Sequence, residues 1–433
     1  MLFLYKYFSF VYNIGAAFIS RGRIAMDRVI LHCDMNGFFA SVELLDYPHL
    51  KDRPMAVCGN PENRHGIILA KNEIAKKYGV ITAETLWQAK KKCPDLQVVP
   101  PHHSKYRYYS HLINDIYLRY TDMVEPFSVD ESWLDVTGST KLFGSGKEIA
   151  DTIRKTVRDE LGLTLSAGVS FNKIFAKMGS DYKKPDATTV ITRENFRILL
   201  WPMDISSMFF VGKITAEKLR SSGIRTIGDL ARSNRDMITR LLGKQGDVIY
   251  NYANGIDDTP VLRYDQREQV KSIGNGTTFR RNLTGHDDIK TAVTGLSDTV
   301  ATRLRKHRMK AFGIKVDIKD PQFKVISRQR QLENPTNLTE IISNTAMDII
   351  KKSWQMRAPI RMLTITAINL CDENQAQQLS LFSEEDITLE KSEKIERTMD
   401  DIREKFGSAA ISFGSVVKND IGLDPDMTSG KDD

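Results

Sequence analysis

The chain has 433 residues, of which 41% are hydrophobic and 27% charged. This length exceeds what one hydrophobic core usually serves, so we expect about three domains. The four cysteines lack paired spacing, which argues against a disulfide framework or a zinc site. Residues 371–433 hold 7 Lys and Arg against 16 Asp and Glu, so the net charge of +7 leaves +16 on the preceding 370 residues. A basic body with an acidic tail favours a polyanionic ligand.

Residues 1–25 are rich in Phe, Tyr, Leu and Ile and carry few charges. A signal peptide or an anchor is one interpretation of such a segment. However, Ser9, Asn13 and Gly15 interrupt it, and its apolar runs are short for a membrane span. We therefore predict an extension or a misassigned start before Met26, and a cytoplasmic protein without a membrane partner.

Residues 26–191 combine apolar strands with amphipathic helices. Runs at 29–33, 133–136 and 165–170 predict strands, and the spacing of Ile149, Ile153 and Val157 predicts a helix over 147–161. We expect the helices to cover one side of a sheet, as in an α+β domain.

Three carboxylates arrive on two of these strands. Asp34 ends the first apolar run, and Asp130 and Glu131 interrupt the second. A charge on a buried strand is costly unless it is compensated. The economical compensator is a pair of hard divalent cations, as in two-metal phosphoryl-transfer sites. Taken alone, the three carboxylates would equally suit a cyclase or a nuclease.

The pattern changes after residue 194. It is purely helical to about residue 254. Within it, residues 211–224 are typical of a helix–hairpin–helix. The exposed backbone N–H groups of such a motif can bind a DNA phosphate without reading the base sequence. Strands return at 313–319 and 362–368, with helices between them, which predicts a separate small α+β domain. From Asp372 onward Gln, Glu, Asp and Ser dominate, so we predict a disordered acidic tail.

Three motifs in a fixed order carry a resemblance to a known family. Residues 31–43, 128–132 and 167–177 together resemble the Y-family translesion DNA polymerases, particularly their bacterial branch, and the likeness extends from about Asp27 to Leu370. It implies an α+β multidomain right-hand polymerase with palm, fingers and thumb, an additional α+β little-finger domain and the disordered tail. The implied boundaries are 1–25 for the extension, 26–37 and 103–191 for the catalytic palm, 38–102 for the fingers, 192–258 for the helical thumb, 259–268 for a linker, 269–370 for the DNA-binding little finger and 371–433 for the tail.

The resemblance also implies roles for residues near the first motif. The expected catalytic residues are Asp34, Asp130 and Glu131, which together with Met35 would hold two Mg²⁺ ions. Phe39 is the expected steric gate, which stacks under the sugar and excludes a 2′-hydroxyl. Because adjacent aromatic residues on an extended segment point opposite ways, its neighbour Phe38 should enter the core.

Two lysines are expected to contact the deoxynucleoside triphosphate. Lys184 follows the third motif, and Lys76 lies on the predicted fingers helix at 71–80, where it is a good phosphate partner. Glu73 stands where the family usually has a Tyr. An acidic side chain near phosphates would be unfavourable unless it is turned away.

Further sites are expected in the thumb, the little finger and the tail. The little-finger residues among them should form one basic sheet surface for the DNA backbone. The tail segment 378–382 matches the bacterial sliding-clamp peptide, in which apolar side chains fill a pocket and Gln makes polar contacts. The DNA-binding residues are Gly212, Lys213, Arg280, Arg281, Lys315, Arg328 and Arg330, and the clamp-binding residues are Gln378, Leu379, Leu381 and Phe382.

These features predict a template-directed DNA polymerase that works as a monomer on primer–template DNA, with low fidelity and a role in translesion synthesis. No segment resembles a proofreading exonuclease, and small fingers would check the new base pair poorly. One alternative is a polymerase subunit that needs partner proteins. Another is a non-catalytic DNA-binding scaffold that recruits the clamp, although the intact acidic triad argues against it.

Overall fold

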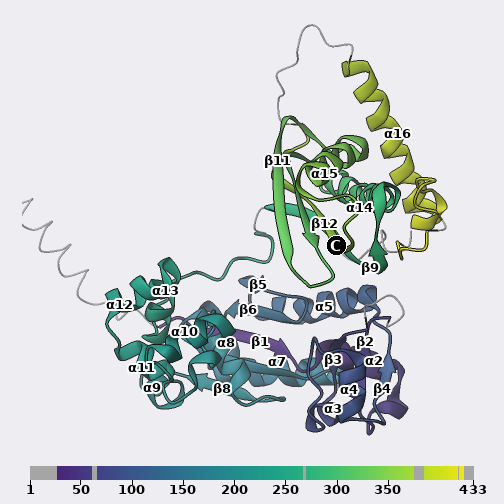
Figure 1. Ribbon diagram of the computed structural model, residues 1–433. Coiled ribbons are helices and arrows are strands. Elements are labelled where there is room, and N and C mark those ends of the chain that lie inside the picture. The colour runs from purple at the N-terminus through teal and green to yellow at the C-terminus, as the bar shows by residue number, and fades with distance from the viewer. Residues whose placement is uncertain (1–26, 61–65, 267–269, 375–384, 418, 424–433) are drawn as a thin grey trace, which may run out of the picture. The chain divides into compact units, whose positions relative to one another are not determined.

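The computed structural model describes residues 27–60, 66–266, 270–374, 385–417 and 419–423 (Figure 1). The chain divides into two compact units, one formed by residues up to 45 together with 106–267, and the other by 46–105 together with 268–433. The expected extension at 1–25 and the expected clamp-binding peptide at 378–382 lie outside the described residues.

A five-stranded sheet with the order β5-β6-β1-β7-β8 is the centre of the first unit. Neighbouring strands are antiparallel, except that β7 and β8 are parallel. The strand predicted at 133–136 falls mostly in β6, which forms an antiparallel hairpin with β5. The strands are β1 (Ile30–Met35), β5 (Val124–Pro126), β6 (Glu131–Asp135), β7 (Leu165–Ser170) and β8 (Thr188–Ile191).

Helices cover both faces of this sheet, so the expectation of one covered side is wrong. Leu31 and Cys33 pack into a core with α5 (His103–Leu118) and α7 (Gly146–Leu161). His32 and Asp34 project to the opposite face, where α8 (Lys173–Tyr182) covers them. This helix lies very close to the sheet, since a Cβ at Gly168 would be 1.9 Å from the carbonyl oxygen of Ala176. The unit also contains α2 (Phe38–Asp46), η3 (Thr137–Ser139) and α6 (Thr140–Phe143).

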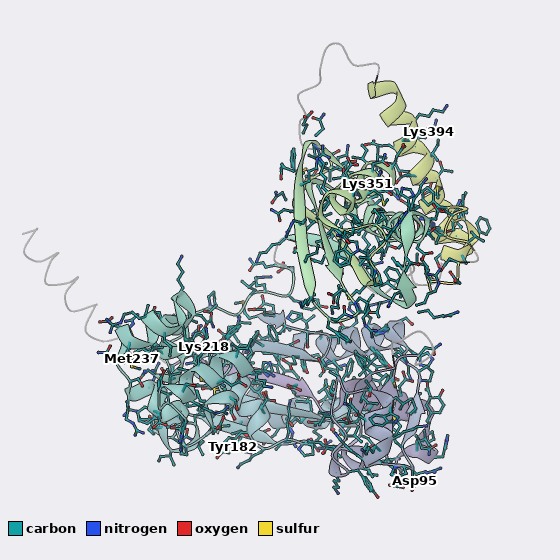
Figure 2. All side chains as sticks on the ribbon, viewed as in Figure 1. Asp95, Tyr182, Lys218, Met237, Lys351 and Lys394 are labelled. Atoms are coloured by element: carbon teal, nitrogen blue, oxygen red, sulfur yellow. The ribbon has the colours of Figure 1, made fainter. Side chains whose placement is uncertain are left out.

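The predicted helical region after residue 194 is confirmed. Its buried side chains, such as Leu219, Leu230 and Ile249, share a core with Phe175 of α8. Exposed side chains project outward from it, among them Lys218 (Figure 2). The helices are α9 (Phe196–Leu199), η4 (Ile205–Ser207), α10 (Lys213–Ser221), α11 (Ile227–Arg232), α12 (Arg235–Leu242) and α13 (Lys244–Ala253).

Residues 46–105 fold around a three-stranded sheet with the order β3-β2-β4. The side chains of Asn72 and Thr85 cap its two longer helices by accepting backbone N–H groups. The elements are η1 (Pro48–Leu50), β2 (Met55–Cys58), β3 (Ile68–Lys71), α3 (Glu73–Lys77), α4 (Leu86–Lys92) and β4 (Gln97–Val99).

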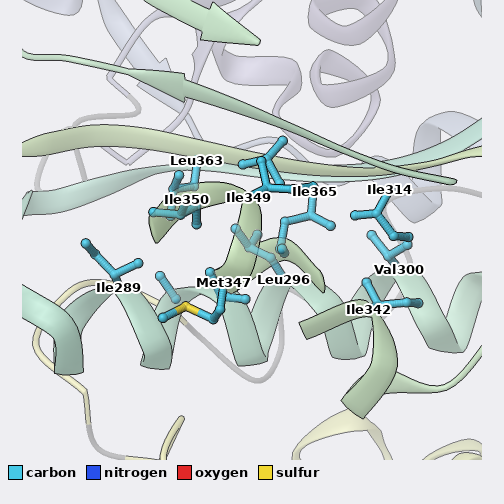
Figure 3. Close-up of a cluster of buried hydrophobic side chains, with 14 of the residues drawn as sticks. Ile289, Leu296, Val300, Ile314, Ile342, Met347, Ile349, Ile350, Leu363 and Ile365 are labelled. Carbon is cyan, nitrogen blue, oxygen red and sulfur yellow. The ribbon is translucent and has the colours of Figure 1, made fainter. Parts of the chain in front are cut away.

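The predicted second α+β domain is an antiparallel sheet with the order β11-β10-β12-β9. Two helices cover one face of this sheet (Figure 1). Leu296 and Val300 of the first helix pack against Ile314 and Ile365 of the sheet (Figure 3). The elements are β9 (Ser272–Leu283), α14 (Gly285–Lys306), β10 (Met309–Lys319), β11 (Val325–Thr336), α15 (Thr339–Ser353) and β12 (Ile360–Asp372).

Part of the acidic tail is more ordered than its composition predicts. Residues Glu385–Phe406 form α16, followed by η5 (Ser408–Ala410), and Ile421 joins the core of the α+β domain. Complementary charge explains the docking, because Asp400 and Arg403 of α16 pair with Arg305 and Asp298 of α14. None of the helices in the described part of the chain is long and apolar enough to cross a membrane.

Candidate functional site

The register of β1 and β6 brings the predicted carboxylates together. Asp34 lies directly opposite Glu131, and directly opposed residues of an antiparallel pair project to the same face. The backbone oxygen of Asp130 accepts a hydrogen bond of 3.0 Å from the backbone nitrogen of Met35. Two motifs that are about a hundred residues apart in the sequence therefore meet at one end of β1.

Two ammonium groups pair with these carboxylates. Nζ of Lys177 lies 3.0 Å from Oδ2 of Asp34 and 3.0 Å from Oε1 of Glu131. Nζ of Lys184 lies 2.6 Å from the same Asp34 oxygen and 2.7 Å from Oδ1 of Asp181. Burial alone would lower the pKa of Lys177, but the negative charges of Asp34, Asp181 and Glu131 outweigh it and raise that pKa.

A buried histidine lies behind the carboxylates. Burial, followed by the charge of Lys177, lowers the pKa of His32 to about 3, so its ring is neutral. The Ser180 hydroxyl donates to the Lys177 carbonyl and therefore accepts from Nδ1 of His32 at 2.9 Å. The unprotonated Nε2 of His32 then lies 3.5 Å from Oε2 of Glu131, and neither atom has a hydrogen-bond partner among the described residues.

The third carboxylate is partly shielded from water. Burial, and then the charges of Asp34 and Glu131, raise the pKa of Asp130, although the Ser128 hydroxyl donates to its Oδ1 at 2.6 Å. Mutual repulsion of this kind favours a nearby cation. The side chain of Met35 is buried in the core of the first unit, so only its backbone lies beside the three carboxylates.

The donor set suits a divalent cation. It consists of hard carboxylate oxygens, and the buried Oε2 of Glu131 has no donor within the described residues. In the part of the chain that the structure describes, no three His, Cys, Asp or Glu side chains are gathered in a group that could hold a metal ion. The lysine ammonium groups are instead the cations that contact Asp34 and Glu131.

The aromatic pair after the first motif lies on a helix. Phe38 and Phe39 open α2, so the argument from an extended segment is wrong for these residues. Phe38 is nevertheless buried and Phe39 half-buried. The ring of Phe39 stacks on Tyr106 with centroids 4.0 Å apart and planes at 10°, and the Tyr106 hydroxyl donates to Glu43 at 2.5 Å. These contacts fix the position of the Phe39 ring.

Glu73 and Lys76 lie on α3 in the second unit. Oε1 of Glu73 is 3.4 Å from Nζ of Lys76, and both side chains are about half exposed. The Glu73 side chain is therefore turned toward Lys76. A phosphate that binds Lys76 would have to compete with the Glu73 carboxylate.

The helix–hairpin–helix candidates are open to solvent. Gly212 is the N-cap of α10, whose first turn receives no side-chain cap from the described residues. A Cβ built at Gly212 would meet nothing described within 4 Å, and Lys213 beside it is exposed. Backbone N–H groups at this turn can therefore reach an anion.

The little-finger candidates do not form one basic surface. In the register of β10 and β11, Arg328 lies opposite Val316 and Arg330 lies opposite Ile314, whereas Lys315 lies opposite Gln329. Since opposed residues share a face, Arg328 and Arg330 project to the helix-covered side and Lys315 to the other side. The contact of 3.3 Å between Arg330 and Asp348 of α15 agrees with this assignment.

The last two candidates lie near the C-terminal segment. Arg281 forms ion pairs with Asp288 at 2.5 Å and with Asp420 at 2.7 Å. Its neighbour Arg280 is exposed, and its backbone nitrogen donates to the Ile421 carbonyl at 2.9 Å. The guanidinium of Arg281 is thus already paired with two carboxylates.

Comparison with known proteins gives consistent matches. Residues 33–181 match the impB/mucB/samB family, and residues 270–381 match the C-terminal domain of that family. The chain is 46% identical to DNA polymerase IV of Acetivibrio thermocellus, over 92% of this chain and 99% of the relative. It is 38% identical to DNA polymerase IV of Clostridium kluyveri, over 91% and 99% of the two chains. A solved Y-family DNA polymerase chimera of Dbh and Dpo4 has a similar fold, with a TM-score of 0.70 at 22% identity over 79% of this chain and 99% of that chain.

Proposed function

Because the chain belongs to the Y-family of DNA-directed DNA polymerases, which is the impB/mucB/samB family, we propose that it extends primers by two-metal-ion nucleotidyl transfer in translesion synthesis. The observation that supports this mechanism best is the direct opposition of Asp34 and Glu131 on paired strands, with Asp130 beside them. Their carboxylates offer the hard oxygens that two divalent cations need, and we expect these cations to be Mg²⁺.

The protein residues have distinct tasks in this proposal. Asp34, Asp130 and Glu131 hold the cations, which when bound activate the primer 3′-hydroxyl and neutralise the triphosphate. Lys177 holds Asp34 and Glu131 together through its two contacts of 3.0 Å. Lys184 and Lys76 bind the phosphates of the incoming deoxynucleotide, and Phe39 limits the space beside its sugar.

Primer–template DNA and the sliding clamp are the proposed partners. The first turn of α10 and Lys213 bind a backbone phosphate, and Lys315 contributes from the open face of the second α+β domain. Gln378, Leu379, Leu381 and Phe382 bind the clamp. We place the protein in the cytoplasm as a monomer, with the palm, fingers, thumb and little finger at the boundaries expected from the sequence.

Primer extension by the purified chain with Mg²⁺ tests the mechanism. We expect Asp130→Ala to lower the extension rate by roughly two to three orders of magnitude, because charge stabilisation at the reacting phosphate is lost. Asp135→Asn is the matched control, since Asp135 ends the strand β6 that directly follows Asp130, and its Oδ1 accepts the Thr137 N–H at 2.9 Å, which Asn can also do.

The primer-extension assay has three possible outcomes. Loss of extension in Asp130→Ala with retention in Asp135→Asn supports the metal assignment. Undiminished extension by Asp130→Ala would refute it. A wild-type chain that binds DNA but extends no primer, even with the clamp, would favour the non-catalytic scaffold.

A further inference from the structure

One buried side chain beside the carboxylates has no task in the proposed mechanism. His32 is fully buried on β1, two residues before Asp34. Its ring makes an edge contact with the ring of Trp133, with centroids 5.2 Å apart and planes at 64°. The indole nitrogen of Trp133 donates to the Lys173 carbonyl at 3.0 Å, which fixes the indole. The His32 ring is therefore held against a rigid support behind the carboxylates.

Helix α8 covers the same ring. His32 lies opposite Gly168 in the register of β1 and β7, and a Cβ built at Gly168 would be 2.5 Å from the backbone nitrogen of Ser180. The Ser180 hydroxyl oxygen lies 2.9 Å from Nδ1 of His32. A larger residue at position 168 would push α8 away from the strand and would separate Ser180 from the ring. The close approach at Gly168 therefore fixes the hydrogen bond at Nδ1.

The other ring nitrogen faces a carboxylate oxygen that needs a donor. Nε2 of His32 lies 3.5 Å from Oε2 of Glu131, and both atoms are buried without a hydrogen-bond partner among the described residues. The second oxygen of this carboxylate, Oε1, lies 3.0 Å from Nζ of Lys177. Two buried acceptors that face each other both forgo the hydrogen bond that buried polar atoms normally make. A proton on Nε2 would satisfy both atoms at once.

Two arrangements of the hydrogen atoms fit a neutral His32 ring. When the Ser180 hydroxyl donates to the Lys177 carbonyl, Nδ1 carries the ring proton and Nε2 is bare. When the hydroxyl turns and donates to Nδ1, the ring proton lies on Nε2 and points at Glu131. This change moves one proton from Nδ1 to Nε2 and leaves the charge of the ring unchanged. The Lys177 carbonyl stays within α8, where the backbone N–H one turn later can donate to it.

We propose that His32 is a positioning residue for Glu131, which it holds by a hydrogen bond from Nε2 to Oε2 when primer–template DNA and Mg²⁺ are bound. The Glu131 side chain is 20% exposed, so it has room for the small rotation that closes the present 3.5 Å. With Oε2 held by His32, Oε1 is directed toward Asp34, where Lys177 now contacts both carboxylates. Metal-binding carboxylates depend on such partners for their orientation. This inference rests on the proposed polymerase function, because His32 acts only through Glu131.

Two substitutions separate the two ring nitrogens. The side-chain amide nitrogen of Gln comes to the place of Nε2, and that of Asn comes to the place of Nδ1. His32→Gln can therefore still donate to Glu131, whereas His32→Asn can reach only Ser180. Both variants remove the ring from its contact with Trp133, so both should unfold at a similarly lowered urea concentration. His32→Asn is thus the matched control for His32→Gln.

Steady-state primer extension over a range of deoxynucleotide concentrations compares the two variants. We expect His32→Asn to lower kcat roughly tenfold or more and to leave the KM for the deoxynucleotide unchanged, because a misdirected Glu131 weakens the transition state and not the binding of the nucleotide. His32→Gln should keep kcat within about threefold of the wild type. Equal losses of kcat in the two variants would overturn the proposal and would make His32 a packing residue only.

NMR spectroscopy tests the hydrogen bond itself and depends on neither activity nor the folding of a variant. The full chain with isotope-labelled histidine nitrogens, bound to primer–template DNA and Mg²⁺, reveals which nitrogen of each ring carries the proton. Comparison with His32→Gln or His32→Asn identifies the His32 signals among the eight histidines. We expect the proton on Nε2, and a proton on Nδ1 with a bare Nε2 would overturn the proposal. A wild-type chain that extends no primer would instead contradict the proposed function itself.

Discussion

The ammonium nitrogen of Lys184 lies 2.6 Å from Oδ2 of Asp34. The sequence motif predicts that Lys184 contacts the triphosphate, yet in this structure it neutralises a carboxylate proposed to bind metal. Its side chain is 28% exposed, so it can reach a ligand in solvent while it contacts Asp34. Divalent cations at Asp34 would replace this charge and free Lys184 for the phosphates.

Lys184→Ala should therefore affect substrate binding more than folding. We expect the KM for the incoming deoxynucleotide to rise roughly tenfold or more, because a charge-assisted hydrogen bond to phosphate is lost. Steady-state primer extension over a range of deoxynucleotide concentrations measures this change.

Lys177→Ala is the contrasting variant. Lys177 is buried between Asp34 and Glu131, so its loss leaves two carboxylates without their shared cation. We expect the free energy of unfolding to fall by about 3 kcal/mol in urea denaturation. If Lys184→Ala lowered stability as much as Lys177→Ala and left KM unchanged, Lys184 would be a structural residue only.

Phe39→Ala should relax discrimination between sugars. The stacked contact with Tyr106 holds the Phe39 ring in place, so its removal opens space that a 2′-hydroxyl can enter. We expect the kcat/KM for a ribonucleotide, relative to the matching deoxynucleotide, to rise at least roughly tenfold. Single-nucleotide incorporation assays with both substrates give this ratio.

Phe38→Leu provides the control for Phe39→Ala. Phe38 is buried in the core of the first unit, so this variant should lower the free energy of unfolding by about 1 kcal/mol. Its preference for deoxynucleotides should stay at the wild-type level. An equal loss of preference in both variants would indicate a general disturbance of α2 instead of a steric gate.

Local pattern was enough to predict the strands that carry the carboxylates. The short apolar runs before Asp34 and after Glu131 predict buried strands, and the structure has β1 and β6 there. The same reasoning failed at Phe38 and Phe39, because two adjacent aromatic residues fit a helix start as well as an extended segment.

Features that depend on distant partners were not predictable from the sequence. Lys315 and Arg328 appear equivalent in a basic region, but only the pairing of β10 with β11 shows that they project to opposite faces. The helix α16 is a second example. Its polar composition alone predicts disorder, because its ion-pair partners, such as Arg305 for Asp400, lie 95 residues away in the sequence.

Arg305→Ala should destabilise the second α+β domain. The guanidinium is almost buried, and it contacts Glu396, lies 2.5 Å from Asp400 and donates to the Asn337 carbonyl at 2.9 Å. Its removal would leave the buried Glu396 and the partly buried Asp400 without their shared guanidinium, so we expect a loss of about 3 kcal/mol in the free energy of unfolding.

Arg397→Ala is the matched control on the same helix docking surface. Arg397 pairs with Glu373 at 2.9 Å, but its side chain is half exposed, so the loss should stay below about 1 kcal/mol. Urea denaturation of the full chain, monitored with a spectroscopic probe in the second unit, compares the free energies of unfolding of the two variants. Equal losses would show that burial of the Arg305 pair adds nothing to stability.

Asp204 should make the stability of the helical region depend on pH in the acid range. Hydrogen bonds from the Ser206 side chain and backbone, and then from Arg220, lower the pKa of Asp204 to about 2. A carboxyl whose folded pKa lies below its unfolded value stabilises the fold above the unfolded pKa, and this contribution disappears as the pH falls through the folded pKa.

The variant Asp204→Ala tests this sign directly. Its stability should be lower than that of the wild type at neutral pH, and the difference should shrink as the pH falls from about 4 toward about 2. Arg220→Ala removes only one of the hydrogen-bonding partners and should show a smaller difference over the same range. Urea denaturation at several pH values measures both variants. A difference that grows with acidity would mean that Asp204 is not held in its charged form by these contacts.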